Sequence, residues 1–226
     1  MQAPSGGSAS ASRPRVRLVI ATALAILIVA FAWRHAANGP PLGIALALAI
    51  ANLASCAWLS HAAADPGAFG PLHLGVHAAH LLGVSLWLGG FIPLLMLLSP
   101  AHRVADRSAV AVIHHVGVRF GDIALFAVAL IVLTGVANTA LLVEDTSDLM
   151  SGAFAKLLGA KLLLLLLMLV LAAYNRQVLL PRLASATPWH AAALLRRSVW
   201  AELAIGMVVL LIAGALGITP PGGSAE

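Results

Sequence analysis

The stretch AKLLGAKLLLLLLMLVLAAYNRQV, residues 155–178, decides the fold class of this chain. Its centre, residues 162–174, carries no charged side chain. A helix needs about 20 consecutive apolar residues to cross the hydrocarbon core of a bilayer, which is roughly 30 Å thick. The stretch therefore predicts a transmembrane helix.

The composition of the whole chain also indicates an integral membrane protein. Of its 226 residues, 61% are hydrophobic and 9% are charged, and the mean hydropathy is +1.00. In soluble domains about a quarter of the residues are charged. The net charge is +5, but the 13 Lys and Arg residues are spread thinly and do not form a nucleic-acid-binding patch. The single cysteine, Cys56, excludes an internal disulfide and any metal motif of paired cysteines.

Six apolar blocks are long enough to cross a membrane. They lie at residues 16–33, 42–62, 74–98, 123–143, 155–178 and 199–218. These runs are continuous rather than alternating, which favours helices over a β-barrel. The expected fold is all-α, a polytopic membrane helix bundle of about six transmembrane helices.

Four parts of the chain follow from this pattern. Residues 1–15 form a polar tail that is expected to be disordered, and residues 16–72 hold two spans and a loop. Residues 73–219 form a four-helix membrane domain, and residues 220–226 form a short tail. The first block also contains AFA, which resembles a signal-peptidase site. The apolar core of this block is longer than that of most signal peptides, which favours a retained helix over a cleaved one.

Basic residues predict how the helices are oriented. Three arginines lie between residues 99 and 122 and four lie between residues 176 and 198, whereas the loops after the second and fourth spans hold none. The positive-inside rule places the two basic linkers in the cytoplasm. Six spans would then leave Arg13, Arg15 and Arg17 on the disfavoured outer side, a conflict that one span fewer would remove.

Four histidines gather at the predicted outer boundary of the membrane. They are His61, His73, His77 and His80. On a helix the last three share one stripe, because four residues advance about 40° past one turn and seven fall about 20° short of two turns. Imidazole is the commonest protein ligand for metals and suits copper. Two interpretations stay open: a copper site in which His80 is the deepest ligand, or polar side chains at the ends of spans that reach the headgroups.

Other polar residues interrupt the later spans. They are Asn138, Lys161, Asn175, Arg176 and Glu202. Lys161 can reach water along its own stem, and Arg176 is a typical cytoplasmic anchor. Glu202 gains nothing from the positive-inside rule. It is expected either to pair with Arg176, Arg196 or Arg197, or to lie on a pathway for protons or cations.

Three segments carry a resemblance to a known family. They are RFGDIALFAVALIVLTGVANTALLV (119–143), KLLGAKLLLLLLMLVLAAYNRQVLLPRL (156–183) and LRRSVWAELAIGMVVLLIAGALGITPP (195–221). The chain resembles the copper resistance protein CopD family in these segments, and HLLGVSLWLGGFIPLL (80–95) resembles the His- and Trp-bearing helix of that family. The residues at family-like positions are His80, Trp87, Asn138, Lys161, Asn175, Arg176 and Glu202.

The resemblance implies a multi-pass protein of the bacterial inner membrane that moves copper or protects the cell against it. Copper would be the transported ion, and a periplasmic copper carrier is a candidate partner. The chain is shorter than family members with eight spans and has no Met-rich or Cys-rich capture segment. The identity of the metal and its direction of movement therefore stay open.

Functions of other classes find less support in the sequence. A b-type haem electron carrier is the alternative function, but it commonly takes axial histidines from two helices, and only His61 lies at the edge of a second span. The chain has no H-E-x-x-H pattern and no P-loop. We therefore expect neither an enzyme nor a pump that hydrolyses ATP by itself.

Overall fold

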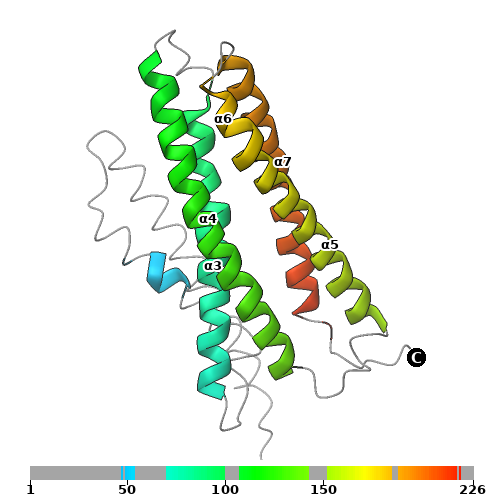
Figure 1. The fold of residues 1–226 in the computed structure, drawn as a ribbon. Helices are drawn as coiled ribbons and strands as arrows, with labels where there is room; N and C mark the ends of the chain where they lie inside the picture. The colour runs from blue at the N-terminus through cyan, green and yellow to red at the C-terminus, as the bar shows by residue number, and fades with distance from the viewer. Residues whose placement is uncertain are drawn as a thin grey trace, which may run out of the picture. The chain divides into compact units, whose positions relative to one another are not determined.

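The computed structural model describes residues 47, 49–53, 70–99, 107–142, 152–184, 188–217 and 219, and the regular elements in these ranges are helices (Figure 1). In chain order they are α3 (Gly70–Leu97), α4 (Arg107–Leu142), α5 (Gly152–Tyr174), the π-helix η4 (Asn175–Leu179), α6 (Leu180–Arg182) and α7 (Pro188–Leu216). The predicted all-helical class is confirmed for this part of the chain.

Two compact units divide the chain, Met1–Leu81 and Leu82–Glu226. The division falls within α3. In the first unit, the described residues are the first turns of α3 and residues 47 and 49–53, which are helical. In the second unit, they are the rest of α3 together with α4, α5, η4, α6 and α7.

Four of the described helical segments are long and apolar enough to cross a membrane. They are Gly70–Leu97, Ala109–Leu141, Gly152–Arg182 and Pro188–Leu216. They correspond to the third to sixth predicted blocks. The first two blocks, both predicted tails and His61 lie outside the described residues, except for residues 47 and 49–53.

Two of these helices begin earlier than the sequence predicted. The fourth apolar block was predicted to begin at residue 123, but α4 runs without a break from Arg107 to Leu142. No proline interrupts this range, so nothing stops the helix from continuing. Similarly, α7 begins at Pro188 rather than near residue 199. Proline suits the first turn of a helix because its ring presets φ and its missing N–H is not needed there.

The helices of the second unit share one core. The helices α4, α5 and α7 alternate in direction, and α5 packs along α7 (Figure 1). Buried side chains come from all four long helices: Trp87 and Phe91 of α3, Ala127 and Ile131 of α4, Met168 of α5, and Leu195 and Val199 of α7. The outer surface is equally apolar. Leu133, Leu163 and Leu211 are 70%, 68% and 73% exposed. Such a surface suits lipid, whose tails are as apolar as leucine itself.

Close contact between α3 and α4 depends on a glycine. A Cβ atom at Gly83 would lie 2.9 Å from the side chain of Ile131 and 3.0 Å from the carbonyl oxygen of Ala127. Small residues allow membrane helices to approach each other closely, because no side chain separates the backbones. The packing of α3 against α4 therefore requires glycine at position 83.

The π-helix η4 alters the direction of the side chains near the end of α5. The backbone N–H of Leu180 donates to the carbonyl of Asn175, five residues back, instead of to a carbonyl four residues back. Pro181 follows immediately and has no N–H to continue the α-helical ladder. The wider turn sets the direction in which Asn175 points.

Candidate functional site

The three histidines of α3 lie in its first turns. His73 is buried at 7% exposure, and His77 and His80 are half-buried. A helix rises 1.5 Å per residue, so His73 and His80 lie about 10 Å apart along the axis. Residues three or four positions apart are neighbours on a helix surface, so His77 neighbours both His73 and His80. The structure thus keeps three of the four predicted histidines on one stripe of α3.

The described residues around the α3 histidines do not form a larger group of metal-ligating side chains. Among the residues that the structure describes, no three His, Cys, Asp or Glu side chains lie close enough together to hold one metal ion. His61, the fourth predicted ligand, lies outside the described residues, and so does Cys56. Metal binding by the α3 histidines therefore stays a prediction.

A second polar group lies inside the second unit, where η4 faces α7. Glu202 of α7 is 1% exposed and Asn175 of η4 is 8% exposed. The Asn175 side chain donates a hydrogen bond from Nδ2 to Oε1 of Glu202. This bond joins two of the residues that the sequence singled out.

Of the two interpretations left open for Glu202, pairing with an arginine is not observed among the described residues. Arg176 was one proposed partner, but its Nη2 atom lies 2.9 Å from Oδ1 of Asp122 on α4. Arg176 directly follows Asn175, but its side chain contacts α4, whereas that of Asn175 contacts α7. Arg196 and Arg197 form no ion pair with Glu202 in the described part of the chain.

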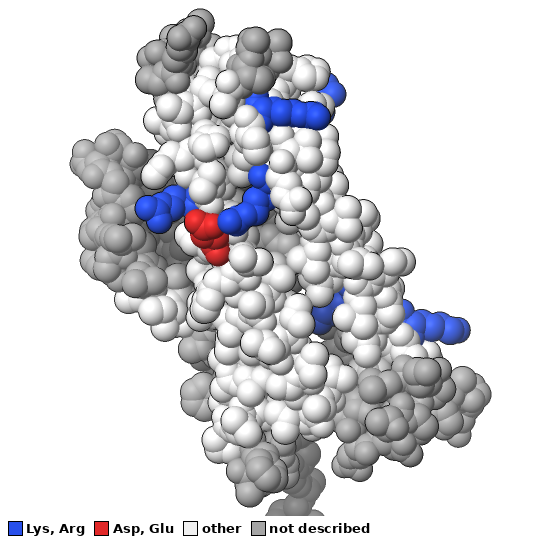
Figure 2. Space-filling view, viewed as in Figure 1, with Lys and Arg blue, Asp and Glu red and all other residues white. Residues whose placement is uncertain are grey.

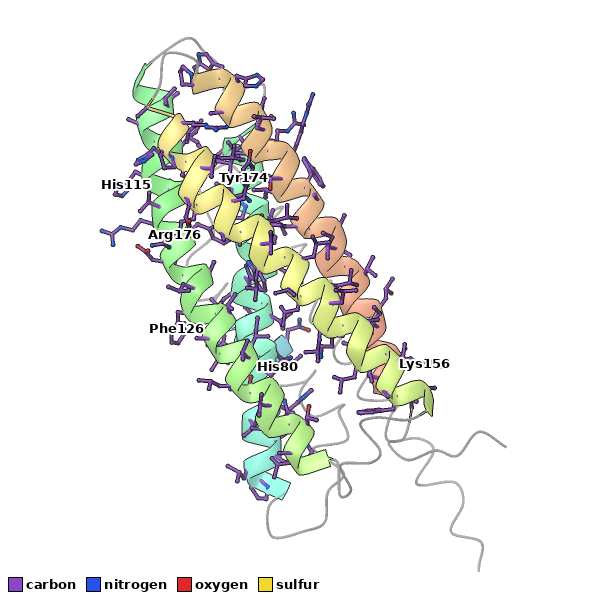
Figure 3. All side chains as sticks on the ribbon, turned by 45° about the vertical axis from the view of Figure 1, so that its right-hand side comes forward. His80, His115, Phe126, Lys156, Tyr174 and Arg176 are labelled. Carbon is purple, nitrogen blue, oxygen red and sulfur yellow. The ribbon has the colours of Figure 1, made fainter. Side chains whose placement is uncertain are left out.

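The ion pair between Arg176 and Asp122 lies on the surface. Both side chains are about half exposed, and Figure 3 shows Arg176 on the side of its helix that meets α4. Figure 2 shows the acidic side chain of this face with basic side chains on both sides. Gly121 leaves room for the guanidinium, because a Cβ there would lie 3.1 Å from Nη1 of Arg176. The sequence interpretation missed Asp122, although a single acid in the apolar segment FGDIALF was a usable signal.

Two other polar residues that the sequence singled out, Lys161 and Asn138, lie apart from the Asn175–Glu202 and Arg176–Asp122 pairs. Lys161 is half-buried in α5, and Asn138 is half-buried in α4. Neither forms a hydrogen bond with another predicted residue in the described ranges, and Oδ1 of Asn138 has no partner there. Lys156, near the start of α5, is exposed (Figure 3).

Trp87 belongs to an aromatic cluster in the core. Its ring centroid lies 6.5 Å from that of Phe91, and Phe91 meets Phe120 of α4 edge to face at 5.5 Å. Aromatic rings favour such tilted contacts because the edge of one ring is positive and the face of the other is negative. The contact between α3 and α4 in this cluster is made by Phe91, and Trp87 packs beside it.

Comparison with known proteins shows which family part of this chain resembles. The family described as Copper resistance protein D matches residues 114–216, which cover most of α4 and all of α5, η4, α6 and α7. No solved structure matches the chain significantly.

Curated relatives match over a longer range. The chain is 32% identical over 181 residues to "Inner membrane protein YebZ" of Escherichia coli, which is 77% of this chain and 58% of the relative. It is 32% identical over 174 residues to "Copper resistance protein D" of Pseudomonas syringae, or 75% of this chain and 56% of the relative. For "Copper transport protein CutJ" of Bacillus subtilis the identity is 33%, over 59% of this chain and 23% of the relative. The chain thus spans little more than half the length of the first two.

Proposed function

We propose that this multi-pass inner membrane protein, whose residues 114–216 belong to the copper resistance protein D family, moves copper across the membrane. The observation that carries the proposal is the family match. It covers both partners of the buried pair, Asn175 and Glu202. Two relatives bear names that refer to copper resistance or copper transport, which supports the same function.

The α3 histidines are the proposed entry site for copper. His73, His77 and His80 form overlapping pairs, so an ion can pass from one pair to the next while keeping one imidazole ligand. Imidazole suits copper, and the neutral ring is the form that binds it. His61 is the proposed additional ligand. A periplasmic copper carrier is the proposed donor of copper. In the proposed arrangement this chain has six transmembrane helices, and its α3 histidines lie at the outer face of the membrane.

The proposed protein is a carrier rather than an enzyme, with copper as its cargo. Import and resistance are the two possible physiological outcomes, and the direction of copper movement separates them. Import raises the copper content of cells that produce the protein. Export, or a block on entry, lowers it.

Total cell copper, measured in cells with and without the protein, tests the proposal. We expect the copper content to change when the protein is produced and to return toward the protein-free value in the variant with all three α3 histidines replaced by alanine. The matched control is His114→Ala with His115→Ala, which removes two exposed histidines of α4. Equal copper content in all strains, at equal membrane abundance, would exclude copper movement by this chain.

A further inference from the structure

A small polar cluster lies inside the bundle around Glu202. Its members are Glu202 and Ser198 of α7 and Asn175 of η4. Ser198 comes four residues before Glu202, so both lie on one face of α7. Glu202 is 1% exposed, Asn175 is 8% exposed, and the Oγ atom of Ser198 is buried. The cluster is surrounded by apolar side chains, including Val199.

Among the described residues, none forms an ion pair with Glu202, and its hydrogen-bond partner is the uncharged amide of Asn175. Arg176 binds Asp122 instead. Arg196 and Arg197 precede Glu202 by six and five residues, which places them more than about 100° away from it around α7.

The other charged or titratable groups of the packed elements form no ion pair or side-chain hydrogen bond with Glu202 or Asn175 among the described residues. They are Lys156, Lys161 and Tyr174 of α5, Arg182 of α6, His190 of α7, and His114, His115 and Arg119 of α4. Lys161, for example, is 14 residues from Asn175 along the chain, or about 21 Å along the axis. An ionised Glu202 would therefore be a buried charge without compensation, which is strongly unfavourable in an apolar bundle.

A neutral carboxyl group suits these surroundings. The Oδ1 atom of Asn175 is buried and accepts no hydrogen bond from any described residue, and the Oγ atom of Ser198 likewise has no partner there. An ionised carboxylate has no hydrogen to donate, whereas a neutral carboxyl group carries one O–H. A neutral carboxyl group and an amide can form two hydrogen bonds with each other. The amide N–H donates to the carboxyl C=O, and the carboxyl O–H donates to the amide C=O. The observed bond from Nδ2 to Oε1 is one half of such a pair.

We propose that Glu202 and Asn175 form a proton-binding site inside the bundle, in which the Glu202 carboxyl holds one exchangeable proton. The proton comes from water and returns to water, so no other reactant is needed. Asn175 positions the carboxyl through the bond to Oε1, and the proton on Oε2 is directed toward Oδ1 of Asn175. The site does not depend on copper and goes beyond the proposed function.

Infrared spectroscopy of the copper-free full chain in lipid nanodiscs tests this site directly. At neutral pH, the difference spectrum between the wild type and Glu202→Gln should show the C=O band of one protonated carboxyl group. The band should move in heavy water because the proton exchanges. Asn175→Ala should raise its frequency, since the carbonyl loses a hydrogen bond. Asp122→Asn, which removes an exposed carboxyl of α4, is the matched control and should leave the band unchanged.

Other outcomes would overturn the proposal. A wild-type spectrum without this band at neutral pH would mean that Glu202 is ionised. Loss of the band when sodium replaces an organic cation in the buffer would assign the site to a metal cation instead. If Glu202→Gln does not fold, Glu202→Asp keeps an acid at this position, and its band should be shifted but present. An unshifted band in Glu202→Asp would assign the signal to another group.

Discussion

Asn175 and Arg176 are neighbours in the chain, but their side chains contact different helices. Asn175 binds Glu202 of α7, and Arg176 binds Asp122 of α4. The sequence identified three of these four residues as unusual, because polar groups in apolar spans are costly. It did not predict their partners, because a π turn before Pro181 changes the direction of the side chains there. Hydropathy patterns assume regular α-helix and contain no such information.

Glu202→Gln tests the importance of the buried acid for copper handling. Glutamine keeps an oxygen that accepts the hydrogen bond from Asn175, so folding and membrane abundance should stay close to those of the wild type. It cannot exchange a proton, so we expect the copper-dependent change in cell copper to fall several-fold. Immunoblots of membrane fractions give the abundance. Wild-type copper handling in this variant would assign Glu202 to packing alone.

His80 is expected to be the most sensitive of the α3 histidines. It lies deepest in the helix, and it coincides with the family-like segment. His80→Ala should weaken copper binding to the purified protein at least about tenfold, or about 1.4 kcal/mol. Because copper binds the neutral ring, and imidazole is ordinarily protonated below about pH 6.5, binding should also be weaker at pH 5.5 than at pH 7.5. Unchanged affinity in all single variants and in the triple variant, at both pH values, would assign the stripe to packing.

The helices themselves were easier to predict than their ends. Four apolar blocks became α3, α4, the α5–α6 segment and α7, because each carries about 20 apolar residues in succession. The early starts of α4 and α7 were missed because those regions are more polar. Their buried positions, such as Ile113 and Leu195, form a stripe that packs on the other helices and not a continuous apolar run.

Packing between α3 and α4 can be tested at two glycines. Gly83→Ala places a methyl group against Ile131 and the Ala127 carbonyl, so we expect a loss of about 1–3 kcal/mol in the free energy of unfolding. Gly89→Ala is the matched control, because nothing lies within 4 Å of a Cβ there. That change should be neutral or stabilise the helix by up to about 1 kcal/mol. Thermal unfolding in detergent measures both, and equal stability of the two variants would argue against the close contact.

The distribution of basic residues predicts how the whole molecule is oriented in the membrane. Seven arginines lie at residues 103–119 and 176–197, in or beside the connections from α3 to α4 and from α6 to α7, so these connections are expected in the cytoplasm. In a background with Cys56→Ala, a single cysteine at Ser147 should react with an impermeant thiol reagent added to intact cells. A cysteine at Ala184 should react only after the cells are opened. The reverse pattern would place the α3 histidines on the cytoplasmic side and remove the proposed entry from the periplasm.

Copper flux into vesicles that contain the purified chain tests copper movement by this protein most directly. We predict that copper crosses the membrane faster than in protein-free vesicles. The rate should fall toward the protein-free value when His73, His77 and His80 are all replaced by alanine, while the His114→Ala, His115→Ala control keeps the wild-type rate. Flux equal to that of protein-free vesicles for the wild type, at verified incorporation, would contradict the account.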